Sequence, residues 1–234
     1  MKVIILNLPR SIERRERMIK LINNRINVEF FPAIDAAESD FLYKERSQPE
    51  ITKKRFGYVL LDSEIACFST HITAWEKCAQ LNKPIIVLED NCEIDDVFFD
   101  SFSRIIKLAS EYDYIKLAAT RPRKFKIIKE IFDGYYIGKY NSRCCGTIGY
   151  IITPRAAKKF IDASKHIVEP VDDFMEKTYK HGIHTYCIKP NLLHRAAVPS
   201  TIGTMRKNKS SISFIDKICI EIFRLYEQYK SRRQ

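Results

Sequence analysis

The sequence predicts an α/β domain with a mixed, mostly parallel sheet and a basic helical tail. Short β-branched runs at residues 3–8 and 85–88 are typical of buried strands. Residues 62–81 between them carry apolar side chains at helical spacing. This strand–helix–strand order favours parallel pairing with helices on the sheet faces. The 234 residues, 45% of them hydrophobic, are enough for one such domain with a sizeable core.

The first third of the chain predicts two strands and a loop. Val3 to Leu8 form the first strand, and Ser11 is placed to cap the Arg-rich helix that follows. Residues 28–34 predict a second strand that is interrupted at Pro32. Residues 36–57 are charged and irregular, so we expect a surface loop that closes over a bound ligand.

The next helix has clear limits in the sequence. Asp62 or Ser63 begins it, and Asn82-Lys83-Pro84 ends it directly before the strand at 85–88. Its inward-facing positions follow helical spacing and are Ile65, Phe68, Ile72, Trp75 and Ala79.

The second half of the domain continues the alternation of strands and helices. Asp133-Gly134 predicts a hairpin turn, and Thr153-Pro154 predicts a capped helix start. The predicted elements are a helix at 98–109, a strand at 114–117, a hairpin at 127–140, a strand at 146–153, a helix from 154, a short helix at 172–180 closed by His181-Gly182, and a strand at 186–188.

The tail differs from the rest of the chain, so we divide the sequence into a domain at 1–205 and a helix at 206–234. Its apolar residues form one helical stripe, namely Ile215, Ile218, Cys219, Ile222, Leu225, Tyr226 and Tyr229. Basic residues surround or precede the stripe: Arg206, Lys207, Lys209, Lys217, Arg224, Lys230, Arg232 and Arg233. Such a helix is typical of a membrane-surface anchor, and a helix packed on the domain is the alternative.

Composition limits the partners and the compartment. A net charge of +11 favours anionic partners such as nucleotide phosphates, nucleic acid or anionic lipid. Seven cysteines without a C-x-x-C pair argue against a disulfide framework and a zinc knuckle, and favour reduced thiols in the cytoplasm. We find no stretch long enough to cross a bilayer, so we expect a cytoplasmic protein, peripheral on the inner membrane.

The strongest candidate site is Glu89-Asp90-Asn91, directly after the buried strand at 85–88. Ligands of parallel sheets bind at the carboxyl ends of the strands. Two carboxylates and an amide oxygen there suit Mg²⁺ or Mn²⁺, which usually bridge to a diphosphate. The alternative is a pair of carboxylates that caps a turn or pairs with lysine.

Basic and polar residues near the first helix are candidates for phosphate binding. Asn7, Arg10, Arg14 and Arg15 lie where the first strand gives way to that helix, and helix starts favour phosphate. An exposed basic helix face would explain any single arginine equally well.

Further candidates lie on three other segments. Glu64 and His71 share one helix face, although a histidine in such a place is more often a core residue. Asp172 is either a helix cap or the general base of a transfer reaction. His194 and Arg195 follow the last predicted strand and are possible phosphate contacts.

Several blocks in order resemble glycosyltransferase family 25, the lipooligosaccharide galactosyltransferases and their relatives. They are Ile5-Leu6-Asn7-Leu8 with Arg10 and Arg14-Arg15, Phe31-Pro32-Ala33-Ile34-Asp35, Ser63 to His71 with Trp75, Val87 to Asn91, Gly146 to Ile152, and Pro170-Val171-Asp172. Two positions differ from the family pattern: Thr70-His71 replaces Ser-His, and Asn91 replaces the third acidic residue. The resemblance covers roughly residues 2–200.

The resemblance implies a GT-A-like fold that binds a UDP-sugar, usually UDP-galactose, with Mn²⁺ or Mg²⁺, and inverting transfer onto a lipooligosaccharide core. It makes Asp90 the principal metal ligand, with Glu89 and Asn91 beside it. Donor-binding residues would be Asn7, Arg10, Arg14, Glu64, His71 and Glu89, and the catalytic residues would be Asp172 and Asp90.

Two other functions remain open at this point. A metal-dependent nucleotidyltransferase would use the same ion and diphosphate but release pyrophosphate. A basic adaptor for membranes or nucleic acid would bind polyanions in a salt-sensitive way without turnover. Nucleic acid is the less favoured partner, because aromatic residues are not interleaved with the basic ones.

Overall fold

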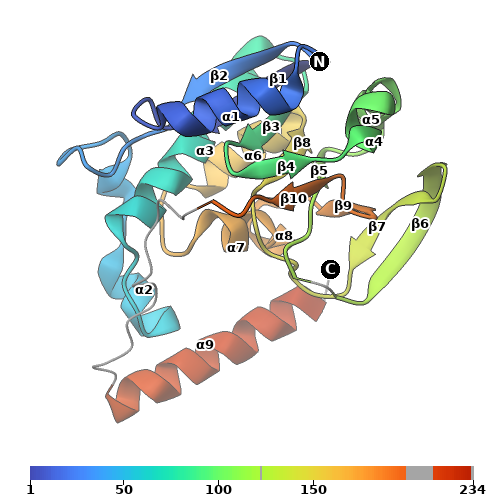
Figure 1. Ribbon diagram of the computed structural model, residues 1–234. Coiled ribbons are helices and arrows are strands. Elements are labelled where there is room, and N and C mark those ends of the chain that lie inside the picture. The colour runs from blue at the N-terminus through green and yellow to red at the C-terminus, as the bar shows by residue number, and fades with distance from the viewer. Residues whose placement is uncertain (122, 199–212, 233–234) are drawn as a thin grey trace.

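The computed structural model describes residues 1–121, 123–198 and 213–232 and is organised around a mixed sheet of eight strands (Figure 1). The strand order is β2-β1-β3-β8-β5-β9-β7-β6. The strands are β1 (Lys2–Asn7), β2 (Val28–Pro32), β3 (Ile85–Glu89), β5 (Tyr114–Lys116), β6 (Phe125–Phe132), β7 (Tyr135–Tyr140), β8 (Gly149–Ile152) and β9 (Tyr186–Lys189). Two further strands, β4 (Cys92–Ile94) and β10 (Leu193–Arg195), pair with each other.

The sheet is mixed, but the expectation that it is mostly parallel is wrong. Three neighbouring pairs are parallel, β1–β2, β1–β3 and β5–β9, whereas the other four are antiparallel. The difference arises because β8 enters between β3 and β5 in the opposite direction and because the β6–β7 hairpin pairs antiparallel to β9. The parallel pairing that the strand–helix–strand rhythm predicts therefore holds for β1–β2, β1–β3 and β5–β9 but not for the rest of the sheet.

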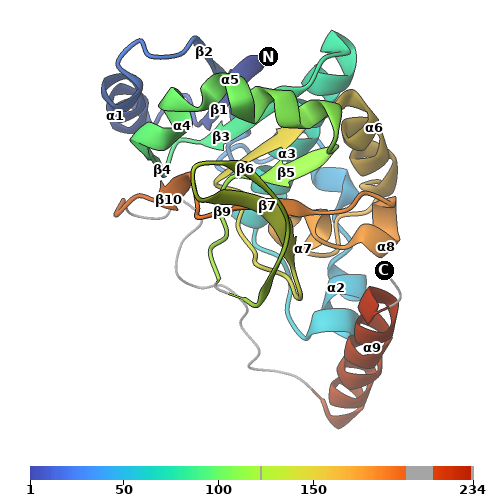
Figure 2. The same cartoon turned by 90° about the vertical axis from the view of Figure 1, so that its right-hand side faces the viewer.

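Helices cover both faces of the sheet (Figure 2). One core contains side chains of α3, α6 and α7, with Trp75 at its centre, and the other contains side chains of α1, α4 and α5. The helices are α1 (Ile12–Ile22), α2 (Pro49–Phe56), α3 (Asp62–Leu81), α4 (Asp96–Asp100), α5 (Phe102–Lys107), α6 (Pro154–Ala163), α7 (Val171–Met175), α8 (Thr178–His181) and α9 (Phe214–Arg232), with 3₁₀ turns at Lys44–Arg46 and Leu108–Ser110.

Most local signals in the sequence act as expected. Asn82 adopts the left-handed conformation that ends α3, and the Thr153 hydroxyl accepts a hydrogen bond from the Ala156 amide at the start of α6. Asp133 and Gly134 form the predicted hairpin turn. Ser11 does occupy the N-cap of α1, but its side chain makes no capping hydrogen bond.

Three predicted segments differ in the structure. The segment 36–57 is not an irregular loop, because Pro49 begins α2, Gly57 ends it and the buried Thr52 hydroxyl donates to the Val168 carbonyl. The helix expected at 98–109 is divided at Ser101, where the backbone leaves helical geometry. The helix expected at 172–180 is divided into α7 and α8.

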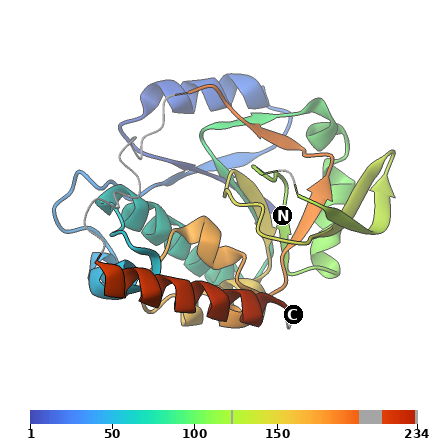
Figure 3. The ribbon, with the colours of Figure 1, turned by 90° about the horizontal axis from the view of Figure 1, so that it is seen from below.

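The C-terminal helix α9 lies along one side of the domain, next to α2 and α8 (Figures 1 and 3). The predicted boundary at 205–206 and the residues Arg206, Lys207, Lys209 and Arg233 fall outside the described part of the chain. Among the helices that the structure describes, none combines the length and apolar character needed to cross a bilayer.

Candidate functional site

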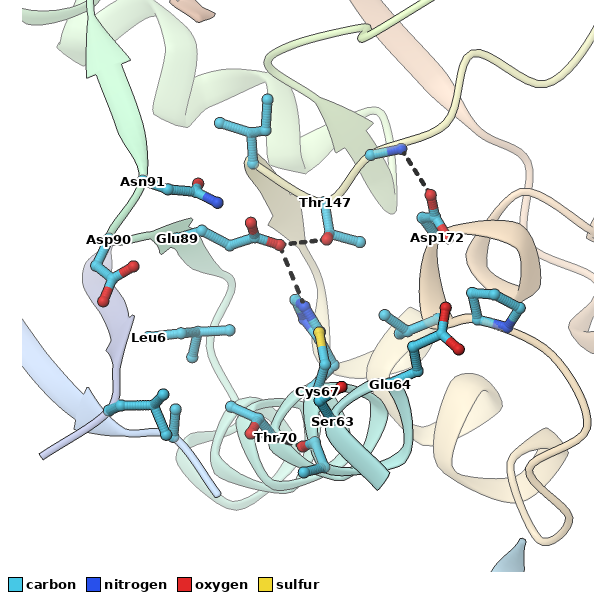
Figure 4. Close-up of a pocket in the computed structure, with 18 of the residues that line it drawn as sticks. Leu6, Ser63, Glu64, Cys67, Thr70, Glu89, Asp90, Asn91, Thr147 and Asp172 are labelled. Atoms are coloured by element: carbon cyan, nitrogen blue, oxygen red, sulfur yellow. Dashed lines mark hydrogen bonds and ion pairs between the residues drawn. The ribbon is translucent and has the colours of Figure 1, made fainter. Parts of the chain in front are cut away.

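A cavity of about 380 Å³ opens where β1 and β3 end and β8 begins. Its walls come from segments far apart in the sequence, including the start of α3, the loop before β8 and the start of α7. The structure brings most of the predicted site residues to this wall, and Asn7 lies directly behind Asp90. The predicted residues that line the cavity include Arg10, Arg14, Glu64, His71, Glu89, Asp90, Asn91 and Asp172. Arg15, which lies over the Phe30 ring, and His194 do not line the cavity. Figure 4 shows Asp90 and Asn91 at one side of the cavity, Glu89 and Thr147 in the middle, and Glu64 and Asp172 at the other side.

Asp90 is buried and is held by two donors from the first strand–helix unit. The Asn7 side-chain amide donates to Asp90 Oδ2 at 2.8 Å, and Arg14 Nη1 donates to Oδ1 at 2.9 Å. The Asp90 amide donates to the Leu6 carbonyl at 3.2 Å. Arg14 thus neutralises a carboxylate whose burial would otherwise be costly.

Other arginines of this region also have definite partners. Arg17 donates to the backbone carbonyls of Asp90 and Cys92, at 3.0 and 2.6 Å, and so fixes the turn after β3. Arg10 is exposed and pairs with Asp35 at the end of the β2 segment. Because both Arg10 and Asp35 line the cavity, this pair forms its outer wall.

Glu89 lies at the centre of the cavity and is ionised. Burial raises the pKa of its carboxyl group, but the hydrogen bonds and charge of His71, with hydrogen bonds from Thr147 and Asn91, outweigh burial and hold this pKa below its usual range. The Thr147 hydroxyl donates to Glu89 Oε1, and His71 Nε2 lies 3.8 Å from the same oxygen.

His71 also contacts buried neighbours on the side away from Glu89. Trp75 Nε1 donates to the Tyr150 hydroxyl oxygen at 3.1 Å, which leaves the Tyr150 proton to be donated to His71 Nδ1, 2.9 Å away. His71 is fully buried at the wall of the cavity, where its Nε2 faces Glu89.

Asp172 holds the loop before β8 against α7. Its Oδ2 accepts a hydrogen bond from the Gly146 amide at 3.2 Å, and its Oδ1 accepts one from the Asp173 amide at 3.0 Å. Gly146 has φ +78° and lies against Thr120, so no larger residue fits this position without strain. Burial, together with the charge of Asp172, raises the pKa of the Asp173 carboxyl, while Arg143 opposes this rise.

Glu64 combines a structural and a cavity-facing position. Its Oε2 accepts a hydrogen bond from the Leu61 amide at 3.1 Å, which fixes the start of α3. The side chain is buried and lines the cavity on the same side as Asp172.

Two arginines at the cavity have no role in the ion pairs that the structure describes. They are Arg121, which follows β5, and Arg195, which ends β10. Both are exposed, and neither forms an ion pair within the described residues. Arg121 was missed in the sequence, because it lies in the loop after β5 and not at the end of a strand as Glu89 does. His194, the neighbour of Arg195, instead faces Asp95 at 3.0 Å.

The end of β3 presents oxygen atoms of the type that a divalent ion binds, although both Asp90 oxygens already accept hydrogen bonds from Asn7 and Arg14. No three Asp, Glu, His or Cys side chains in the described chain are grouped as a metal site. Mg²⁺ and Mn²⁺ nevertheless need only one or two protein oxygens when phosphate oxygens complete their shell. Asn91 Oδ1 is buried next to Asp90 and accepts no hydrogen bond within the described part of the chain.

Fold and cavity define a class: an α/β protein with a ligand cavity at the carboxyl ends of its strands, lined by both arginines and carboxylates. The chain belongs to glycosyltransferase family 25, because the model of the family described as "Glycosyltransferase family 25 (LPS biosynthesis protein)" matches residues 1–175.

Three relatives illustrate the range of the family. A glycosyltransferase 25 family member of Drosophila pseudoobscura pseudoobscura is 29% identical over 84% of this chain and 33% of the relative. The lipooligosaccharide biosynthesis protein lic2B of Haemophilus influenzae is 25% identical over 70% of this chain and 62% of the relative. Procollagen galactosyltransferase 1 of Danio rerio is 25% identical over 79% of this chain and 32% of the relative. The chain therefore spans about a third of the length of the insect and fish relatives.

Proposed function

We propose that this protein is an inverting glycosyltransferase that moves galactose from UDP-galactose to a lipooligosaccharide core glycan. Family membership supports glycosyl transfer, and the names of the Haemophilus and Danio relatives support the acceptor class and the sugar, respectively. The observation that carries the proposal is that four arginines and several carboxylates line one cavity: the arginines can meet a diphosphate, and the carboxylates of Glu89 and Asp172 can accept hydrogen bonds from sugar hydroxyls.

The donor would lie along the edge of the sheet. Arg10, which follows β1, and Arg14, in the first turn of α1, would lie on the nucleotide side, while Arg121 and Arg195 are available for phosphate oxygens. The hexose would then lie over Thr147, between Glu89 and Asp172 (Figure 4). Glu89, fixed by His71 and Thr147, would accept a hydroxyl hydrogen bond and select the sugar.

In the transfer step, the acceptor hydroxyl oxygen forms a bond to the anomeric carbon as the bond from that carbon to the diphosphate breaks. The electron pair of the broken bond leaves with UDP, and Asp172 takes the proton of the hydroxyl. Asp172 suits this role because its two backbone hydrogen bonds fix its orientation while it stays at the cavity wall.

A divalent ion fits this scheme at Asp90 and Asn91, with Glu89 nearby. It would supply positive charge for the departing diphosphate. Arg14 already holds Asp90 in place, so the carboxylate has a fixed orientation before any ligand arrives.

We also propose that the protein works in the cytoplasm at the inner membrane surface, where a lipid-linked acceptor would be found. A small soluble acceptor would then be a poorer substrate than the same glycan in a membrane, because the protein and the acceptor share a surface in the second case.

UDP release tests the proposed reaction. A panel of UDP-sugars with a soluble acceptor glycan should give turnover with UDP-galactose, and Asp172→Asn should lower kcat at least about 100-fold with little change in KM. Asp173→Asn is the matched control and should keep most of the activity, because the Asp173 carboxylate pairs with Arg143 and does not line the cavity. Release of pyrophosphate, or an Asp172→Asn variant as active as the wild type, would refute the reaction or the base, respectively.

A further inference from the structure

The C-terminal helix α9 has an inner face that contacts the domain and an outer face that does not. The inner face carries Phe223, whose ring meets Phe56 of α2 edge-on at 5.4 Å. The same face carries Glu227, which accepts a hydrogen bond from the Tyr179 hydroxyl at 2.8 Å. The helix is therefore part of the folded unit in the structure.

A buried ion network fixes this inner face. Lys177 is 3% exposed and donates to both Glu169 and Glu227, and Glu169 is 1% exposed. Lys177 follows α7, the helix that carries Asp172. Loss of Glu227 would leave the buried Lys177 ammonium group with one carboxylate fewer. The ion network therefore stabilises the position of α9 on the domain.

The outer face of α9 is apolar and exposed. Ile218, Ile222 and Leu225 lie at i, i+4 and i+7, and between 47% and 62% of each side chain is exposed. Tyr226 and Tyr229 extend this surface and are about half exposed. The apolar stripe that the sequence predicts is thus the face that the domain leaves uncovered, and an apolar stripe of this kind marks an interaction surface.

Basic residues border the outer face. Lys217, Arg224 and Lys230 belong to α9 itself, and α2 adds Lys53 and Lys54. Hydrogen bonds from Ser213 lower the pKa of the Asp216 carboxyl, and the positive charges of Lys53 and Lys54 lower it further, which places the basic end of α2 beside the first turn of α9. An apolar stripe with lysine and arginine around it complements a bilayer that carries anionic headgroups.

We propose that the outer face of α9, formed by Ile218, Ile222 and Leu225 with the basic residues of α2 and α9, binds an anionic lipid surface. The helix lies flat in the headgroup region, and its inner face stays bound to α2 and α8 (Figure 3). This orients the whole domain, because the same helix is tied through Lys177 to the segment that carries Asp172. The inference rests on the proposed function in one respect, since binding to the membrane surface would bring the enzyme to a lipid-linked acceptor.

Vesicle co-sedimentation without donor or acceptor tests this surface independently of catalysis. Vesicles of phosphatidylcholine with added phosphatidylglycerol should bind the full chain, and vesicles of phosphatidylcholine alone should bind it much less. The double variant Ile222→Ser, Leu225→Ser should lower the partition coefficient at least about tenfold. The matched control is Ile127→Ser, Ile128→Ser on β6, whose side chains are about as exposed and lie away from α9; it should bind as the wild type does.

Three results would overturn the proposal. The first is no binding of the wild type to anionic vesicles, and the second is equal loss in the two double variants. The third is a concentration-dependent dimer in analytical ultracentrifugation that only Ile222→Ser, Leu225→Ser abolishes, which would assign the face to a second copy of the chain. UDP release with a soluble acceptor is measured on the same preparations, so a failure of the transferase proposal is seen separately.

Discussion

Gly146 provides the sharpest test of how the cavity wall is built. A Cβ atom at this position would lie 2.5 Å from Thr120 Cγ2, and the backbone has φ +78°. Gly134 in the β6–β7 turn has nearly the same backbone, with φ +80°, but nothing within 4 Å of the added Cβ. Gly134→Ala should therefore cost only the left-handed strain, about 1–2 kcal/mol in the free energy of unfolding.

Gly146→Ala should cost that strain and a further 1–3 kcal/mol, roughly, for overpacking against Thr120. The clash would also move the Gly146 amide away from Asp172 and Thr147 away from Glu89, so UDP release should fall with stability. Urea unfolding and UDP release measure the two effects. Thr120→Ser removes the nearest methyl group and should recover part of both losses in Gly146→Ala. If Gly146→Ala is as stable as Gly134→Ala and fully active, the wall is not packed as described.

Two further predictions concern the helices beneath the site. Burial lowers the pKa of His181 from 6.5 to about 4, although the hydrogen bond that Nε2 donates to the Phe174 carbonyl acts in the opposite direction. In the neutral ring Nδ1 accepts a hydrogen bond from the Ile183 amide, which protonation of Nδ1 would break. Between these two pH values the unfolded chain therefore binds more protons than the folded chain. The buried neutral His181 contributes about 3 kcal/mol to the free energy of unfolding above pH 6.5, and this contribution is lost as the pH falls to 4. Urea unfolding at several pH values should show the loss, and His181→Gln should lack that part of the pH dependence. Glu227→Gln should lower the free energy of unfolding by about 2 kcal/mol, because Glu227 pairs with the buried Lys177. Glu221→Gln on the exposed side should change this free energy by less than about 0.5 kcal/mol. Equal losses for the two variants in chemical denaturation would contradict the buried network around Lys177.

The sequence was most informative where local rules determine the structure. The ends of α3, the β6–β7 turn and the strand before Glu89 follow from Asn82, Asp133-Gly134 and a short apolar run, and all three are present. The antiparallel entry of β8 was not predictable in this way, because strand direction depends on pairing between residues more than fifty positions apart. The same holds for β4, which depends on pairing with β10.

The candidate site was recognised through its residue types, whereas its internal contacts came only from the structure. The sequence placed Asp90 and Asn91 after a buried strand, but it gave no indication that Asn7 and Arg14 would occupy both oxygens of Asp90. The connection from Trp75 through Tyr150 and His71 to Glu89 likewise joins α3, β8 and β3, which only the folded sheet brings together. The rule that singled out Glu89 could not have found Arg121, because Arg121 lies in the loop after β5 and not at the strand end.

The most direct test of the site is the binding of UDP to the wild type and to Asp90→Asn, measured by calorimetry with and without Mn²⁺. The account predicts that Mn²⁺ raises the affinity of the wild type for UDP at least about tenfold and that Asp90→Asn loses this gain while remaining folded. Equal affinity of both proteins for UDP, unaffected by Mn²⁺, would contradict the assignment of the diphosphate to the end of β3.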